Sequence, residues 1–131
     1  MSGPLKIVLI DDDQGVLRAL GLVLQTLGHQ TALFTSGSEA LSYLTHNPTV
    51  DIVVSDLRMP IMDGAAVLRQ IRHRHQTIPG VIMSGHATPN DRATLIALGA
   101  RGVLSKPFSP QELLTLADNE KRNGEARGKV A

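Results

Sequence analysis

Short apolar runs alternate along this chain with longer stretches in which apolar residues recur every three or four positions. An unbroken apolar run this short is typical of a strand buried on both faces of a parallel sheet. Four such runs, rich in β-branched residues, lie at positions 5–10, 52–55, 81–84 and 102–105, and a weaker one lies at 30–34. The pattern therefore predicts five strands.

The stretches between these runs predict amphipathic helices. In the first stretch, apolar residues from Val16 to Leu27 follow one helix face, and Gly28 supplies a stop signal. A further apolar face, from Val67 to Ile71, predicts a helix that opens after Gly64. Three more helix starts are marked by a hydroxyl residue followed three positions later by an acid, a pair that satisfies free N–H groups of a first turn. These pairs are Ser36 with Glu39, Thr88 with Asp91, and Ser109 with Glu112.

Strand and helix alternate five times, so the predicted fold class is α/β: a single (βα)5 doubly wound parallel sheet with helices on both faces. At 131 residues the chain is long enough for one domain with a core, and too short for two. We place this domain at residues 5–117. From 118 to 131 the sequence is polar, and Asn123-Gly124 and Gly128 predict a helix end followed by a linker or tail.

The composition limits the cellular compartments and the classes of binding partner that we expect. A chain with 42% hydrophobic and 19% charged residues is ordinary for a folded domain, and a net charge of +1 gives no electrostatic reason to expect nucleic-acid binding. The absence of cysteine excludes disulfides and thiolate metal sites. The apolar run at 5–10 is too short to span a membrane. We therefore expect a cytoplasmic protein that does not contact membranes.

Polar residues follow four of the predicted strands. A single aspartate in such a place is usually a helix cap or turn former, and we interpret Asp13 as the cap of the first helix. Parallel strands share the edge at which their carboxyl ends meet, and α/β proteins bind ligands there. The residues expected to converge on that edge are Asp11, Asp12, Asp56, Ser84 and Lys106.

Charge indicates what such a group could do. Three close carboxylates repel one another, and a hard divalent cation relieves the repulsion. Oxygen ligands without histidine or cysteine suit Mg²⁺, or Mn²⁺ in its place. A lysine beside them can pair with a carboxylate or with a phosphoryl group. These parts together suit the transfer of a phosphoryl group onto a carboxylate.

The sequence resembles response regulator receiver domains from about residue 6 to 116. Four segments carry the resemblance: 6–13, with its three aspartates; 53–64, which reads VVSDLRMPIMDG; 82–86; and 105–108, which reads SKPF. All four occur in the order and at the spacing of that family. The resemblance implies a chemotaxis-regulator-like, flavodoxin-like strand order of 2-1-3-4-5. It also implies a phosphoprotein of two-component signal transduction, a switch that catalyses only its own phosphorylation and dephosphorylation and is otherwise no enzyme.

The resemblance implies a role for each acid. Asp56 would be the phosphoacceptor, taking its phosphoryl group from a sensor histidine kinase or a histidine phosphotransfer protein. The metal ligands would be Asp11, Asp12, Asp56 and the backbone carbonyl of Arg58, with Asp12 bound directly.

It also implies roles for the residues around the acids. Ser84 and Lys106 would bind the phosphoryl group and act as the switch. Pro107 would follow a cis peptide bond, and Gly64 would shape the loop into the third helix. Residues 87–116 would form the face that changes on phosphorylation and contacts an output domain or a second copy in a homodimer.

Some positions depart from the family pattern or extend it. Val103 stands where the family often has an aromatic switch residue, so transmission would depend on Ser84 and its loop. Gly80 stands where an apolar residue is more usual, and we expect it to weaken that strand slightly. Arg58 and His86 occupy positions that tune the lifetime of the phosphoryl group in the family. We interpret the neighbouring histidines His73 and His75 as solvated.

Three other interpretations stay open on the residues alone. A haloacid dehalogenase-type phosphotransferase would use Asp11 as its nucleophile, but it leaves the 53–64 segment unexplained. A flavodoxin-like cofactor binder is disfavoured by the three aromatic residues of the chain and by the lack of a phosphate-cradling loop after the first strand. A receiver used only as a docking module is disfavoured by the intact set of acids, hydroxyl and lysine.

Overall fold

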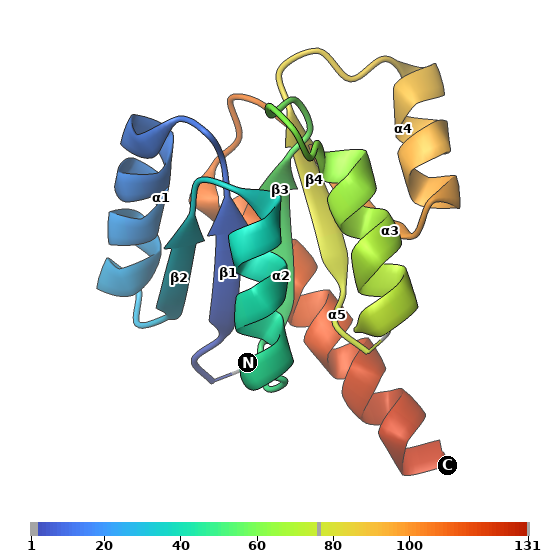
Figure 1. Ribbon diagram of the computed structural model, residues 1–131. Helices are drawn as coiled ribbons and strands as arrows, with labels where there is room; N and C mark the ends of the chain where they lie inside the picture. The colour runs from blue at the N-terminus through green and yellow to red at the C-terminus, as the bar shows by residue number, and fades with distance from the viewer. Residues whose placement is uncertain (1–2, 76, 131) are drawn as a thin grey trace.

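Five parallel strands form one sheet in the order β2-β1-β3-β4-β5 (Figure 1). The computed structural model describes residues 3–75 and 77–130. The strands are β1 (Lys6–Ile10), β2 (Gln30–Phe34), β3 (Ile52–Asp56), β4 (Gly80–Ser84) and β5 (Ala100–Ser105). The helices are α1 (Gln14–Thr26), α2 (Gly37–His46), α3 (Gly64–Arg74), α4 (Pro89–Ala97) and α5 (Pro110–Val130). The predicted fold class and strand order are confirmed.

Helices cover both faces of the sheet, as the unbroken apolar strands required. In Figure 1, α2 and α3 lie in front of the sheet and α5 lies behind it. Successive residues of β1 serve opposite layers: Leu9 packs in one buried cluster with Leu24 of α1 and Leu113 of α5, whereas Val8 packs in another with Leu44 of α2. This two-layer core fixes the strand ends, and with them the groups at the sheet edge.

The capping signals act as the sequence predicts. The Asp13 carboxylate caps α1 by accepting hydrogen bonds from the N–H groups of Gly15 and Val16 at 2.9 and 3.2 Å. Thr88 and Asp91 exchange side-chain and backbone hydrogen bonds at the start of α4. Such caps satisfy N–H groups that have no partner within the helix.

Gly80 has a packing reason that its sequence did not reveal. It is buried in β4, which lies between β3 and β5 in the sheet. A Cβ atom at this position would lie 2.9 Å from Cδ2 of Leu68 in α3. The glycine therefore lets α3 pack close to the sheet. The slight weakening of the strand that we expect from a glycine stays a prediction.

The expected helix break at Asn123-Gly124 is wrong, because α5 continues to Val130. A glycine within a helix costs only about 1 kcal/mol relative to alanine. Pairs along the helix offset part of this cost: Arg122 contacts Asp118 at 3.3 Å, and the Asn123 amide donates to Glu120 at 3.5 Å. Residue 131 lies outside the described chain, and a linker role for 118–131 stays a prediction.

Within residues 3–75 and 77–130, no helix combines the length and the apolarity that crossing a membrane requires.

Candidate functional site

Three carboxylates meet at the carboxyl ends of β1 and β3. These strands are paired, Ile10 with Ser55, so the residues that follow them are neighbours. One carboxylate oxygen from each of Asp11, Asp12 and Asp56 lies within 4.8 Å of the other two. Only 2% of the Asp11 side chain and 14% of the Asp56 side chain are exposed, whereas Asp12 is exposed. The convergence predicted for these acids is confirmed.

Lys106 joins two of the acids from the end of β5. Its Nζ donates a hydrogen bond to Oδ2 of Asp11 and another to Oδ1 of Asp56, both at 3.0 Å. Its backbone N–H donates to the Ser84 carbonyl at 2.8 Å, which ties this residue to the end of β4. The peptide bond from Lys106 to Pro107 is cis, as the resemblance implied.

The electrostatics of the cluster follow from burial and charge. Burial raises the pKa of Asp56 and the negative charges of Asp11 and Asp12 add to this, while the hydrogen bond and charge of Lys106 oppose it; the net shift is upward. For Lys106 burial acts to lower the pKa, but hydrogen bonds to Asp56 and Asp11 prevail, so its pKa is raised. Lys106 therefore stays charged. Its single positive charge offsets only part of the negative charge of the three carboxylates.

The donor set fits a hard divalent cation. All the candidate ligands in the cluster are carboxylate oxygens, the ligand type that Mg²⁺ and Mn²⁺ prefer. Asp11 already accepts hydrogen bonds on both oxygens, from the Asp13 N–H at 3.0 Å and from Lys106. Asp12, exposed beside it, is the acid best placed to contact a cation directly.

Ser84 lies beside the acids at the end of β4. In the sheet Asp56 pairs with Met83, so Ser84 is the next residue along the neighbouring strand. Its side chain is 5% exposed, and its Oγ accepts a hydrogen bond from the His86 N–H at 3.3 Å. Among the described residues no acceptor is found for its hydroxyl hydrogen, so this hydrogen can be donated to an anion at the site.

The loop from Asp56 to α3 depends on Gly64. The Gly64 N–H donates to the Leu57 carbonyl at 2.8 Å, and a Cβ atom at position 64 would lie 2.6 Å from the Asp56 carbonyl oxygen. No side chain fits there without moving the backbone of Asp56. Asp63 then caps α3 by accepting from the Ala66 N–H at 2.9 Å.

Ile61, in the same loop, has an unusual backbone and is fully exposed. Its φ of 69° lies in the left-handed region, and the Met62 N–H donates to the Pro60 carbonyl at 2.7 Å across it. This is a γ-turn centred on a β-branched residue, a strained arrangement that the sequence did not signal.

Arg58 and His86 are exposed beside the site, where contact with solvent is possible. The interpretation of His75 as solvated is wrong, whereas His73 is exposed. His75 ends α3, where the chain turns back toward β4, and it is half-buried. Its Nε2 is buried and has no hydrogen-bond partner within the described chain.

Arg92 is a residue that the sequence interpretation missed. From α4 its guanidinium donates to the Val103 carbonyl at 2.9 Å and to the Ser105 hydroxyl at 3.3 Å. It thus binds the strand that carries Lys106, at the residue where the family's aromatic position falls. The sequence carries only a weak signal for this contact, namely an arginine near the start of the helix that precedes the edge strand β5.

The chain matches the family of the response regulator receiver domain over residues 7–118, and it belongs to that family. It is therefore a receiver domain of a two-component response regulator, a signalling module. This membership rejects the interpretation of the chain as a flavodoxin-like cofactor binder. Together with the burial of Asp11, it also rejects the dehalogenase-type interpretation, in which Asp11 would be the nucleophile.

Two relatives illustrate the wider context. The DNA-binding transcriptional regulator NtrC of Klebsiella pneumoniae is 38% identical over 110 residues, which is 84% of this chain and 23% of that protein. The transcriptional regulatory protein QseB of Haemophilus influenzae is 37% identical over 109 residues, 83% of this chain and 49% of that protein. The chain thus spans half or less of the length of these relatives.

Solved structures agree with the fold. A response regulator receiver domain from Clostridium thermocellum superposes with a TM-score of 0.87 at 27% identity, covering 93% of this chain and 98% of that one. The chemotaxis protein CheY4 of Vibrio cholerae gives 0.81 at 26% identity, with 89% and 98% covered.

Proposed function

We propose that Asp56 accepts a phosphoryl group from a phosphohistidine of a sensor histidine kinase or histidine phosphotransfer protein. One observation carries the proposal: Lys106 Nζ lies 3.0 Å from both Asp11 and Asp56 in a cluster of three carboxylates. Asp56 is also the more accessible of the two paired acids, as a nucleophile must be.

The reaction requires one bond to form and one to break. A carboxylate oxygen of Asp56 attacks phosphorus, and the bond from phosphorus to the donor nitrogen breaks with its electron pair going to the imidazole. The product is an acyl phosphate on Asp56. Lys106 offsets part of the charge that gathers on the transferred oxygens.

Mg²⁺ or Mn²⁺, when bound, would neutralise charge on the phosphoryl oxygens. The residues that would hold it are Asp11, Asp12, Asp56 and the backbone carbonyl of Arg58. Placing the acceptor among other acids makes a cation necessary, since repulsion between carboxylates alone would oppose the approach of a phosphoryl group.

Phosphorylation would act as a switch through Ser84 and Lys106. The phosphoryl group adds roughly −1.5 to −2 charges and three acceptor oxygens, which this hydroxyl and ammonium can satisfy by moving inward. Two charge-assisted hydrogen bonds of about 1.5–3 kcal/mol each approach the ~5.5 kcal/mol that a nearly complete change of state requires. Residues 87–116 would change with them and contact an output domain or a second copy.

Arg58 and His86 would tune the lifetime of the acyl phosphate by flanking the attacking water. Both side chains are exposed beside the acceptor, which supports this role. Arg58→Ala and His86→Ala should each change the dephosphorylation rate, measured as loss of the phosphorylated mass with time. Rates equal to wild type in both variants would remove the idea.

The test of phosphoryl transfer is incubation with acetyl phosphate or phosphoramidate and Mg²⁺, followed by intact mass measurement. Wild type should gain the mass of one phosphoryl group, and Asp56→Asn should gain none. Asp63→Asn, an acid in the same loop that caps α3, is the control and should still be phosphorylated. A chain that gains no mass would be a receiver used only for docking, and the proposal would then be wrong.

A further inference from the structure

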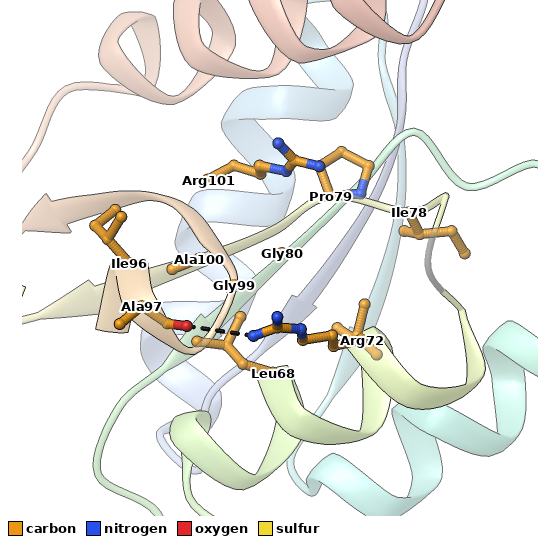
Figure 2. A pocket seen from close by; sticks show the side chains of 11 residues that line it. Leu68, Arg72, Ile78, Pro79, Gly80, Ile96, Ala97, Gly99, Ala100 and Arg101 are labelled. Carbon is orange, nitrogen blue, oxygen red and sulfur yellow. Dashed lines mark hydrogen bonds between the residues drawn. The ribbon is translucent and has the colours of Figure 1, made fainter. Parts of the chain in front are cut away.

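A cavity of about 590 Å³ lies at the opposite end of the sheet from the acids. It is bordered by the ends of α3 and α4 and by the starts of β4 and β5 (Figure 2). Small-molecule sites in proteins have volumes of roughly 300–1,000 Å³, so this space is of the right size for an organic molecule.

About half of the surface that lines the cavity is apolar, and the other half is polar. Leu68, Ile71 and Ile78 are buried and contribute to its lining, together with Ile96 from α4, whose side chain is 48% exposed. An exposed isoleucine in the lining leaves apolar surface that a ligand could remove from water.

The charge of the cavity has one sign. Arg72 of α3 and Arg101 of β5 line it at separate edges, and no acid is among the lining residues that the structure describes (Figure 2). Arg72 donates to the Ala97 carbonyl at 3.3 Å, and Arg101 pairs with Glu120 at 3.5 Å. A guanidinium has five N–H donors, so these contacts leave donors free on both residues.

We propose that this cavity binds a small organic anion with an apolar body, such as an aromatic carboxylate. The apolar part would lie against the isoleucines and Leu68, and the carboxylate would accept hydrogen bonds from Arg72 or Arg101. Guanidinium groups suit this role because their planar donors match the two oxygens of a carboxylate. The site is separate from the phosphorylation site and does not depend on it.

Three probes separate the two parts of the proposal. 2-Naphthoate has both the apolar body and the charge, 2-naphthamide has the same shape without the charge, and acetate has the charge without the body. In an amide NMR titration, 2-naphthoate should shift the resonances of Gly99 and Ala100 with a dissociation constant on the order of a millimolar or below. The amide and acetate should each bind at least about tenfold more weakly.

Variants then place the site. At least one of Arg72→Gln and Arg101→Gln should weaken 2-naphthoate binding by about tenfold, the loss expected for one charge-assisted hydrogen bond. Arg74→Gln is the matched control, because it removes one charge from the same helix but does not line the cavity. Ala97→Phe places a ring at the cavity wall and should abolish binding while the rest of the amide spectrum stays folded.

Several outcomes would overturn the proposal. Equal binding of 2-naphthoate and 2-naphthamide would show that the charge of the ligand does not contribute to binding. An equal loss in Arg74→Gln would reduce the effect to net charge. Absence of shifts at the lining residues would show that no such anion binds there, and shifts explained by self-association through Ile96 would assign the surface to a protein contact instead. Phosphorylation of Asp56 in Arg72→Gln should match wild type, which keeps this result distinct from failure of the proposed function.

Discussion

At the scale of single residues, the environment of Asp56 predicts how the stability of the fold depends on pH. Its pKa in the folded chain is raised, chiefly by burial. The folded state therefore binds the Asp56 proton more tightly than the unfolded state does. The resulting stabilisation is complete below the unfolded pKa of 3.8 and is lost as pH rises through the folded value. Relative to a neutral side chain at this position, an ionised Asp56 lowers the stability of the fold.

Asp56→Asn should accordingly raise the free energy of unfolding at neutral pH without divalent cations. Urea unfolding at a series of pH values checks this, and the difference from wild type should shrink as pH falls below the raised pKa. Asp63→Asn, which removes an acid but keeps an amide that can cap α3, is the control. A variant less stable than wild type at neutral pH would show that Lys106 outweighs burial.

Gly64 and Gly85 form a matched pair of glycines around the site. At Gly64 a Cβ atom would lie 2.6 Å from the Asp56 carbonyl oxygen, whereas at Gly85 nothing lies within 4 Å. Gly64→Ala should therefore destabilise the domain by about 2–3 kcal/mol, as overpacking does, and Gly85→Ala by less than about 1 kcal/mol. Denaturant unfolding of both variants checks the difference, and equal losses would contradict it.

At the scale of elements, Arg92 connects α4 to β5. Its two hydrogen bonds reach the Val103 carbonyl and the Ser105 hydroxyl, next to Lys106. Arg92→Ala should lower the free energy of unfolding by about 0.5–1.5 kcal/mol for each hydrogen bond lost. It should also speed amide hydrogen exchange within α4. Arg69→Ala, an exposed arginine of α3, is the control. Unchanged protection of residues 89–97 would show that the bonds do not hold the helix.

The elements themselves were predictable where their signals are local. Apolar runs located the strands, caps such as Asp13 and Thr88 located helix starts, and the edge rule for parallel sheets brought the acids together. What depended on packing between distant segments was not predictable. The bonds of Arg92 to β5, the reason for Gly80 and the burial of His75 all require the placement of a second element.

The length of α5 was missed for a related reason. Asn123 and Gly124 oppose a helix locally, but side-chain pairs between residues one turn apart offset the loss. A rule that reads one residue at a time cannot weigh these small opposing terms.

At the scale of the whole molecule, a bound divalent cation should stabilise the domain. A ligand that binds only the folded state adds about 2.7 kcal/mol at a hundredfold excess over its dissociation constant. Adding Mg²⁺ should therefore raise the thermal midpoint of wild type, followed by circular dichroism. Asp12→Asn should lose the increase, and Glu125→Gln, an exposed acid of α5, should keep it. An increase preserved in Asp12→Asn would place the cation elsewhere.

The five-residue length of β4 has a consequence for how the two ends of the sheet can influence each other. Such a strand is about 16 Å long, which exceeds the screening distance of roughly 8 Å at physiological ionic strength. Adding negative charge beside Asp56 should thus leave the potential around Arg72 and Arg101 almost unchanged. Any communication between these ends must then be mechanical, through displacement of α4 or β5, and its strength should be insensitive to added salt.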